Sequence, residues 1–307
     1  MQKLTAVQTE DFNQPKGIQR ALRLPDPKLG ALWDSIILDE RIKDQLLSQA
    51  MLNFTMRGKV DRNVIPLHGV IMLVGPPGTG KTSLARGLAH RTALSFQGAG
   101  FRLLEVEPHA LTSSAMGKTQ KAVSELFSQS IAEAATAGSI IVLLDEVETL
   151  AADRSKMSLE ANPIDIHRAT DAVLVQLDAL AEQHPNLLFL ATSNFPQAVD
   201  AAFTSRCDLV VHVPLPDRQA CALILADCLA GLGKTYPAIA RLPAAAGFDR
   251  CAAECVGLDG RAIRKMVANA LASSPQTAMN PERVTIEDIL AAARAAKAGR
   301  MPGGKAQ

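Results

Sequence analysis

The sequence predicts an α/β protein whose core contains a mainly parallel sheet and which ends in a small α-helical domain. Two observations support this fold class. Up to about Pro216, short apolar runs alternate with longer amphipathic stretches, a pattern typical of parallel strands separated by helices. After Asp217 the strand-like runs stop, and apolar residues recur at helical spacing. The length of 307 residues fits about two domains.

The N-terminal residues 1–25 are mostly polar and contain Pro15 and Pro25. Proline lacks a backbone donor and disfavours helix in the residue before it, so this segment is expected to be an extended arm. Between Leu32 and Met56, apolar residues recur at helical spacing and predict one or two helices. We therefore expect the large α/β domain to cover residues 26–216.

Five apolar runs are the expected strands of the sheet. They do not alternate cleanly between apolar and polar residues, which favours strands buried on both faces. The stretches between them, such as residues 118–138, are the expected helices. The runs lie at residues 69–75, 101–108, 139–146, 186–194 and 207–216.

Residues 217–298 are expected to form the small α-helical lid domain. Its predicted helices cover residues 217–233, 259–273 and 285–298, and residues 299–307 are an expected flexible tail. Thr285 precedes Asp288 by the spacing of a capping box, which marks the start of the last helix.

Composition and charge exclude several classes of protein. Hydrophobic residues make up 48% of the chain and charged residues 21%, so the whole chain is not disordered. The 32 basic and 31 acidic residues nearly balance and aromatic residues make up only 4%, which argues against a nucleic-acid partner. No apolar run approaches the ~18–20 residues that span a bilayer, so no membrane partner is expected.

The sequence also bears on compartment and metals. The N-terminus has no apolar segment of a secretory signal, so a cytoplasmic location is expected. The five cysteines form no CxxC pair and are expected to be reduced and mostly buried. The six histidines show no metal-ligand spacing, so we expect no zinc site.

Residues 75–82 have the sequence GPPGTGKT, which satisfies the phosphate-loop pattern GxxxxGK[ST]. The loop follows a predicted strand and opens a predicted helix, so its backbone N–H groups and the helix N-terminus would surround an anion. Lys81 is expected to reach the β- and γ-phosphates of ATP, and the Thr82 hydroxyl to hold Mg²⁺. The expected ATP-binding residues are Gly75, Pro76, Pro77, Gly78, Thr79, Gly80, Lys81, Thr82 and Ser83.

Two further strands end in polar residues that suit ATP hydrolysis. Asp145 and Glu146 follow the run IIVLL, and Asn194 ends the run that starts at residue 186. In open α/β sheets such strand ends lie beside the phosphate loop. We expect Asp145 to hold Mg²⁺ with Thr82, Glu146 to act as the general base, and Asn194 to orient the attacking water.

Two arginines complete the expected catalytic set. Arg206, in DAAFTSRCD, is a candidate to reach the γ-phosphate of a neighbouring subunit. Arg261 opens a helix of the small domain and is expected to touch the phosphates of its own subunit, with Arg264 as the alternative one turn later. The competing interpretation for each is an ordinary surface arginine.

With these motifs together, the chain resembles the AAA+ ATPases and, more narrowly, the pachytene-checkpoint remodellers that act on HORMA-domain proteins. The AAFTSRCD, EVETLAADR and GLDGR segments point to the narrower family. The matching segments lie at residues 32–39, 75–89, 143–154, 172–180, 191–208 and 257–266.

The resemblance implies a homo-hexameric ring with ATP and Mg²⁺ at subunit interfaces and with adenine near residues 32–36. It implies that ATP hydrolysis drives the unfolding or disassembly of a HORMA-domain protein complex. The 74 residues before Gly75 are too few for the N-terminal domain of eukaryotic relatives, which favours the bacterial branch. Bacterial relatives lie in antiphage operons, where they act on a HORMA protein, alone or bound to a cyclic-oligonucleotide synthase, and switch off its signal.

The segments that would line the ring's pore depart from the resemblance. Ala115 and Met116 stand before Gly117 where relatives usually have bulky residues, and residues 152–165 form an expected second pore loop. The alternative function is an AAA+ loader or motor acting on another protein or on DNA. A small-molecule P-loop kinase and a non-hydrolysing scaffold are two further hypotheses.

Overall fold

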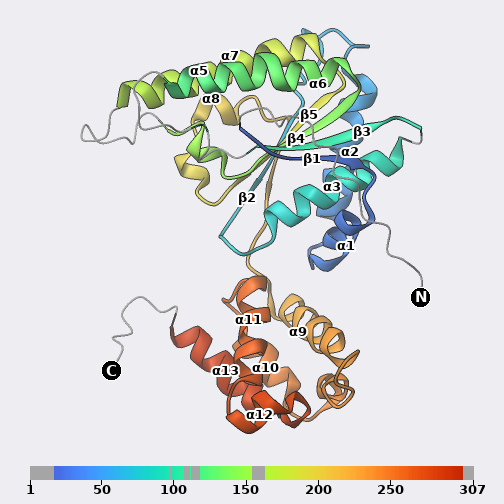
Figure 1. The fold of residues 1–307 in the computed structure, drawn as a ribbon, viewed down its shortest axis with the longest axis vertical. Helices are drawn as coiled ribbons and strands as arrows, with labels where there is room; N and C mark the ends of the chain where they lie inside the picture. The colour runs from blue at the N-terminus through green and yellow to red at the C-terminus, as the bar shows by residue number, and fades with distance from the viewer. Residues whose placement is uncertain (1–16, 97, 107–110, 112–117, 154–162, 300–307) are drawn as a thin grey trace.

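A computed structural model describes residues 17–96, 98–106, 111, 118–153 and 163–299 of the chain. Figure 1 shows an α/β part, which contains every labelled strand, and a separate group of helices that follows it in the chain. The expected pore-loop residues Ala115, Met116 and Gly117, and most of the expected second pore loop, lie outside the described residues. The C-terminal tail beyond residue 299 does so as well.

The sheet has six strands in the order β1-β3-β4-β5-β2-β6. All neighbouring pairs are parallel except β1 and β3, so the predicted mainly parallel sheet is confirmed. The strands β2, β4 and β5 are buried along almost their whole length, as their uninterrupted apolar runs predict. The strands are β1 (Ile18–Leu24), β2 (Val70–Val74), β3 (Phe101–Val106), β4 (Ser139–Leu144), β5 (Leu187–Ser193) and β6 (Leu209–His212).

Strand β1 corrects the expectation of an extended arm over residues 1–25. Residues 18–24 pair antiparallel with β3 at the edge of the sheet, and Ile18 and Leu24 are buried. Gln19, Arg20 and Arg23 remain exposed, as residues of an edge strand can. These polar residues made the segment look like a linker. Residues 1–16 lie outside the described part of the chain.

Helices cover both faces of the sheet (Figure 1). On one face, α5, α6 and α7 pack over a core that includes Phe127 and Phe189, and on the other face α1, α2 and α3 pack over a second core. The helix expected over residues 118–138 is interrupted by a π-helical turn, Leu126–Ile131. The helices are α1 (Pro27–Ser35), α2 (Glu40–Met56), α3 (Lys81–Ser95), α5 (Lys118–Glu125), α6 (Ala132–Thr136), α7 (Pro163–Gln183) and α8 (Ala201–Thr204).

The helical part after β6 has its own hydrophobic core. Its three longest helices, α9, α11 and α13, are those that the sequence predicts, whereas the short α10 and α12 were not expected. The five cysteines are free, and burial raises the pKa of Cys255 in this core to about 12. The helices are α9 (Arg218–Gly233), α10 (Phe248–Glu254), α11 (Gly260–Leu271), α12 (Pro275–Met279) and α13 (Ile286–Ala298).

Within the described residues, every helix is too short or too polar to cross a membrane.

The predicted capping box is present at the start of α13. The Thr285 hydroxyl accepts from the Asp288 N–H at 3.2 Å, and an Asp288 carboxylate oxygen accepts from the Thr285 N–H at 2.9 Å. We expect Thr285→Ala to lower the free energy of unfolding by about 1 kcal/mol, because the first turn loses an acceptor. Urea denaturation checks this, and Thr285→Ser, which keeps the hydroxyl, should behave like wild type. Equal stability of the alanine variant would contradict the prediction.

Candidate nucleotide site

The phosphate loop connects the end of β2 to the start of α3. Gly78 and Gly80 adopt the left-handed backbone with φ of 80° and 92°, which glycine reaches without strain. A Cβ on Gly78 would lie 2.2 Å from Asp259 Oδ1, so no larger residue fits where the loop meets the helical part. The loop backbone and the α3 N-terminus provide N–H groups suited to phosphate oxygens.

Lys81 packs against this loop and is buried, with 5% of its surface exposed. Its ammonium group donates to Gly75 O at 2.8 Å, to Pro76 O at 2.9 Å and to Asn194 Oδ1 at 2.8 Å. Burial lowers the pKa of Lys81, and the nearby Glu148 carboxylate is the strongest charge that opposes this. Because all three hydrogen-bond partners are neutral oxygens, the cation is suited to take an anionic partner.

Asp145 and Glu146 follow β4 and lie beside the phosphate loop. Asp145 Oδ1 accepts from the Thr82 hydroxyl at 2.9 Å and from the Thr192 hydroxyl. A hydroxyl and a carboxylate are oxygen ligands of the kind Mg²⁺ prefers. The phosphate loop and the acidic pair therefore meet in space, although 63 positions separate Thr82 from Asp145.

The Asn194 side chain links Lys81 to Glu146. Its side-chain oxygen accepts from Lys81, and its Nδ2 donates to Glu146 Oε1 at 3.1 Å. Its backbone N–H donates to Glu148 Oε1 at 3.1 Å, which fixes the turn after β5. The amide is thus placed between the phosphate loop and the carboxylate that we expect to activate water.

A cavity of about 260 Å³ adjoins the phosphate loop at the junction with the helical part. Its lining includes Ile36, Val213 and Ile224, which supply apolar walls, and Thr79 and Gly80 of the loop. Ser35 and Ile36 belong to the segment that was expected to lie near adenine. The cavity therefore offers an apolar site next to a phosphate-binding loop, the combination that a nucleotide requires.

Arg261 is the better placed of the two small-domain arginines. Its backbone N–H donates to Gly78 O at 3.4 Å. Its charge also lowers the pKa of Lys81, although burial, which lowers this pKa, and the nearby carboxylates, which raise it, have larger effects. Arg264 instead donates to Asp227 Oδ2 at 2.9 Å. Both arginines line the cavity, but only Arg261 is held against the loop.

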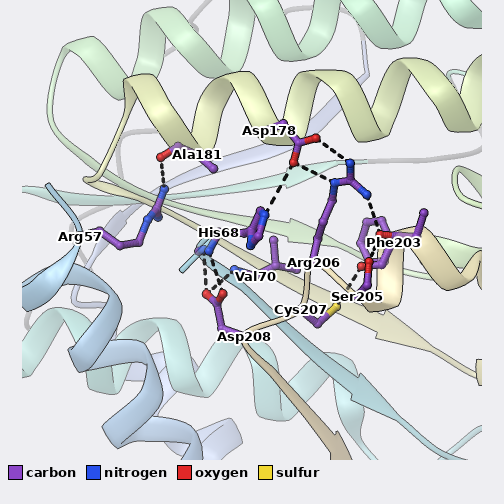
Figure 2. A network of polar contacts seen from close by, with 12 residues as sticks. Arg57, His68, Val70, Asp178, Ala181, Phe203, Ser205, Arg206, Cys207 and Asp208 are labelled. Atoms are coloured by element: carbon purple, nitrogen blue, oxygen red, sulfur yellow. Dashed lines mark hydrogen bonds and ion pairs between the residues drawn. The ribbon is translucent and has the colours of Figure 1, made fainter. Parts of the chain in front are cut away.

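Arg206 lies away from the phosphate loop of its own chain. Figure 2 shows its guanidinium paired with Asp178. Nε donates to Oδ1 at 2.8 Å and Nη2 to Oδ2 at 2.6 Å. The neighbouring Asp208 accepts from the backbone N–H of Val70, the first residue of β2, whereas the phosphate loop follows the last residue of β2. The arginine therefore lies at the opposite end of the strands from the site, and in this subunit it does not join the site.

Comparison with known proteins agrees with this geometry. A model of the family "ATPase family associated with various cellular activities (AAA)" matches residues 71–215. CD-NTase-associated protein 6 of Pseudomonas aeruginosa is 69% identical over 98% of this chain and 99% of its own length. The Pachytene checkpoint protein 2 homolog of Rattus norvegicus is 36% identical over 69% of this chain. The chain belongs to the pachytene-checkpoint family of AAA ATPases. This AAA ATPase spans about half, 50%, of the rat relative's length.

Solved structures show the same fold as this AAA ATPase. The structure of C. elegans PCH-2 aligns with a TM-score of 0.73 and 27% identity over 94% of this chain and 77% of that chain. A chain of the E. coli MS115-1 HORMA:CdnC:Trip13 complex aligns with a TM-score of 0.69 and 17% identity over 93% of this chain and 95% of that chain. The predicted fold class is thereby confirmed.

Two residues of the site in this AAA ATPase were not among those predicted from sequence. Thr192 contacts Asp145 and Glu146, and Glu148 holds the backbone of Asn194. Both lie within two positions of predicted site residues, in LLDEVET and ATSN. The polar strand end at Thr192 was a usable signal, but its hydroxyl partners depend on the pairing of β4 with β5.

Proposed function

We propose that this chain hydrolyses ATP and uses the energy to disassemble a complex that contains a HORMA-domain protein. The observation that supports the proposed hydrolysis is a single hydrogen-bonded network. It joins Lys81 and Thr82 of the phosphate loop to Asp145, Glu146 and Asn194 at the ends of β4 and β5. Thr192 connects the two acids within it. The proposal is supported by the closeness of a cation, two oxygen-bearing side chains of the kind that Mg²⁺ prefers, a second carboxylate and an amide.

The residues present fit ATP with Mg²⁺. Lys81 is a buried cation whose hydrogen bonds all go to neutral oxygens, and the loop backbone supplies donors for phosphate. The residues that would hold the triphosphate are those of the loop from Gly75 to Ser83, and Thr82 and Asp145 would hold Mg²⁺. When bound, Mg²⁺ supplies positive charge to the β- and γ-phosphate oxygens.

Each of four residues of the chain would then have its own role in hydrolysis. Glu146 accepts the proton of the attacking water, and Asn194 orients that water while remaining bonded to Glu146. Arg261 contacts the phosphates from the helical part of the same subunit. Arg206 acts on the γ-phosphate of a neighbouring subunit in a homo-hexamer, because it lies at the far end of the strands from its own phosphate loop.

The proposed substrate follows from the relatives. The similar Pseudomonas aeruginosa protein is named for its association with a CD-NTase, and the E. coli structure contains HORMA, CdnC and Trip13. We propose a HORMA-domain protein bound to a cyclic-oligonucleotide synthase as the complex that this ATPase takes apart. Its disassembly would switch off an antiphage second messenger.

Replacing Lys81 by alanine is expected to weaken ATP binding at least about tenfold, because the triphosphate loses its buried cationic partner. Titration with a fluorescent ATP analogue measures this. Lys234→Ala, which removes an exposed lysine at the end of α9, is the matched control and should bind like wild type. Unchanged binding by Lys81→Ala would remove the basis of the proposed site.

The remodelling activity needs its own experiment. Purified HORMA protein and CD-NTase are assembled into a complex, and its dissociation on addition of the ATPase is followed by size-exclusion chromatography. Dissociation is expected with ATP and wild-type protein, and not with Lys81→Ala. An intact complex, together with ATPase activity stimulated by DNA, would instead favour a motor that acts on DNA.

A further inference from the structure

The Thr192 hydroxyl lies between the two acids that follow β4. Thr192 is the penultimate residue of β5, and 2% of its surface is exposed. Its Oγ1 donates to Asp145 Oδ1 and accepts from the backbone N–H of Glu146 at 3.1 Å. A hydroxyl has one donor and two lone pairs, so it makes both bonds at once. Thr192 therefore fixes the side chain of one acid and the backbone of the other.

The backbone that Thr192 holds has an unusual conformation. Glu146 has φ of 53° and ψ of 55°, in the left-handed region. Within the described part of the chain it is the one residue other than glycine with positive φ. A side chain makes this conformation strained, and such strain persists only where surrounding contacts enforce it. The hydrogen bond from Glu146 N–H to Thr192 is such a contact.

The two bonds of Thr192 serve different parts of the reaction. Asp145 Oδ1 also accepts from the Thr82 hydroxyl, so the two threonines orient this carboxylate from the loop side and from the sheet side. At Glu146, the left-handed turn sets the direction in which the side chain leaves the backbone. Its carboxylate then meets the Asn194 amide at 3.1 Å.

We propose that Thr192 is a positioning residue for ATP hydrolysis, whose hydroxyl aligns Asp145 for Mg²⁺ and Glu146 for water. This inference rests on the proposed ATPase function and deepens it. The hydrogen bonds of the Thr192 hydroxyl go to the two acids, so Thr192 would act through them. The competing explanation is a buried threonine that only satisfies its own hydroxyl and stabilises the fold.

The test compares Thr192→Val, which keeps the shape and removes the hydroxyl, with Thr192→Ser, which keeps the hydroxyl. Thr92→Val is the matched control, because Thr92 in α3 is fully buried and its hydroxyl has no hydrogen-bond partner. For each variant we would measure kcat and KM for ATP, the Mg²⁺ concentration at half-maximal rate, ATP affinity in EDTA, and thermal stability.

We expect Thr192→Val to lower kcat at least about tenfold and to raise the Mg²⁺ requirement, because bonds to both acids are lost. ATP affinity in EDTA should stay within about threefold of wild type, since the phosphate loop is untouched. Thr192→Ser should recover most of kcat, and Thr92→Val should match wild type.

Two results would overturn the inference. The first is a kcat of Thr192→Val within about twofold of wild type. The second is an equal loss in Thr192→Val and Thr192→Ser that follows a fall in thermal stability, which indicates a structural role alone. If wild type itself bound ATP but did not hydrolyse it, the proposed function would fail before this comparison began.

Discussion

Replacing Arg206 by alanine is expected to lower ATP turnover by about 10³-fold or more while leaving the ATP affinity of each subunit unchanged. The structure gives the reason. The Arg206 guanidinium is bonded to Asp178 and to the Ala202 carbonyl, far from its own phosphate loop, so it contributes nothing to binding by its own chain. In the proposed hexamer, Arg206 would instead stabilise the negative charge that develops on the γ-phosphate of the neighbouring subunit. Steady-state ATPase rates and fluorescent-ATP affinity measure the two quantities separately.

Arg294→Ala is the matched control for Arg206, because Arg294 also pairs with a carboxylate, that of Glu254 at 3.6 Å, but lies on α13 in the helical part. It should retain wild-type turnover. An Arg206→Ala protein that hydrolyses ATP at the normal rate would refute the shared site. A loss of ATP affinity in each isolated subunit would show that the arginine acts within its own chain.

Replacing Glu146 by glutamine is expected to lower turnover by about 10²–10⁴-fold with ATP affinity retained. Glutamine keeps the size of the side chain and can still bond to Asn194, but it cannot accept a proton from water. The variant should therefore remain in the ATP-bound state and hold its protein substrate. Turnover, ATP affinity and co-purification of the HORMA complex in ATP check the three parts of this prediction.

The control for Glu146→Gln is Glu287→Gln, which makes the same change at an exposed position in the first turn of α13. Mixing offers a second check. Equal amounts of Glu146→Gln and Arg206→Ala should regain part of the activity, because roughly a quarter of random neighbouring pairs combine an intact acid with an intact arginine. Turnover by Glu146→Gln at the wild-type rate would mean that another group accepts the proton.

The sequence predicts the site residues whose conformation and spacing are set by their immediate neighbours in the chain. Gly78 and Gly80 are needed for a left-handed backbone, and Lys81 and Thr82 follow at a spacing that the loop itself imposes. The strand ends at Asp145 and Asn194 were also predictable, because parallel strands present their carboxyl ends at one edge of the sheet.

The parts that sequence did not predict depend on pairing between distant segments. Thr192 became a site residue because β5 lies beside β4, which puts its hydroxyl against Asp145. The partner of Arg206, Asp178, lies 28 positions earlier on α7. Strand β1 gains its stability from β3, and its own polar residues gave no sign of this.

The hydrogen bond from Arg261 N–H to Gly78 O has a mechanical consequence. It attaches the phosphate loop to the first turn of α11, whose 12 residues extend for about 18 Å. A rotation of the first turn of α11 would displace the far end of the helix more than the end that contacts the loop. If the proposed ATP hydrolysis moves the loop, this hydrogen bond would pass the movement to α11 and so to the C-terminal helices that pack on it.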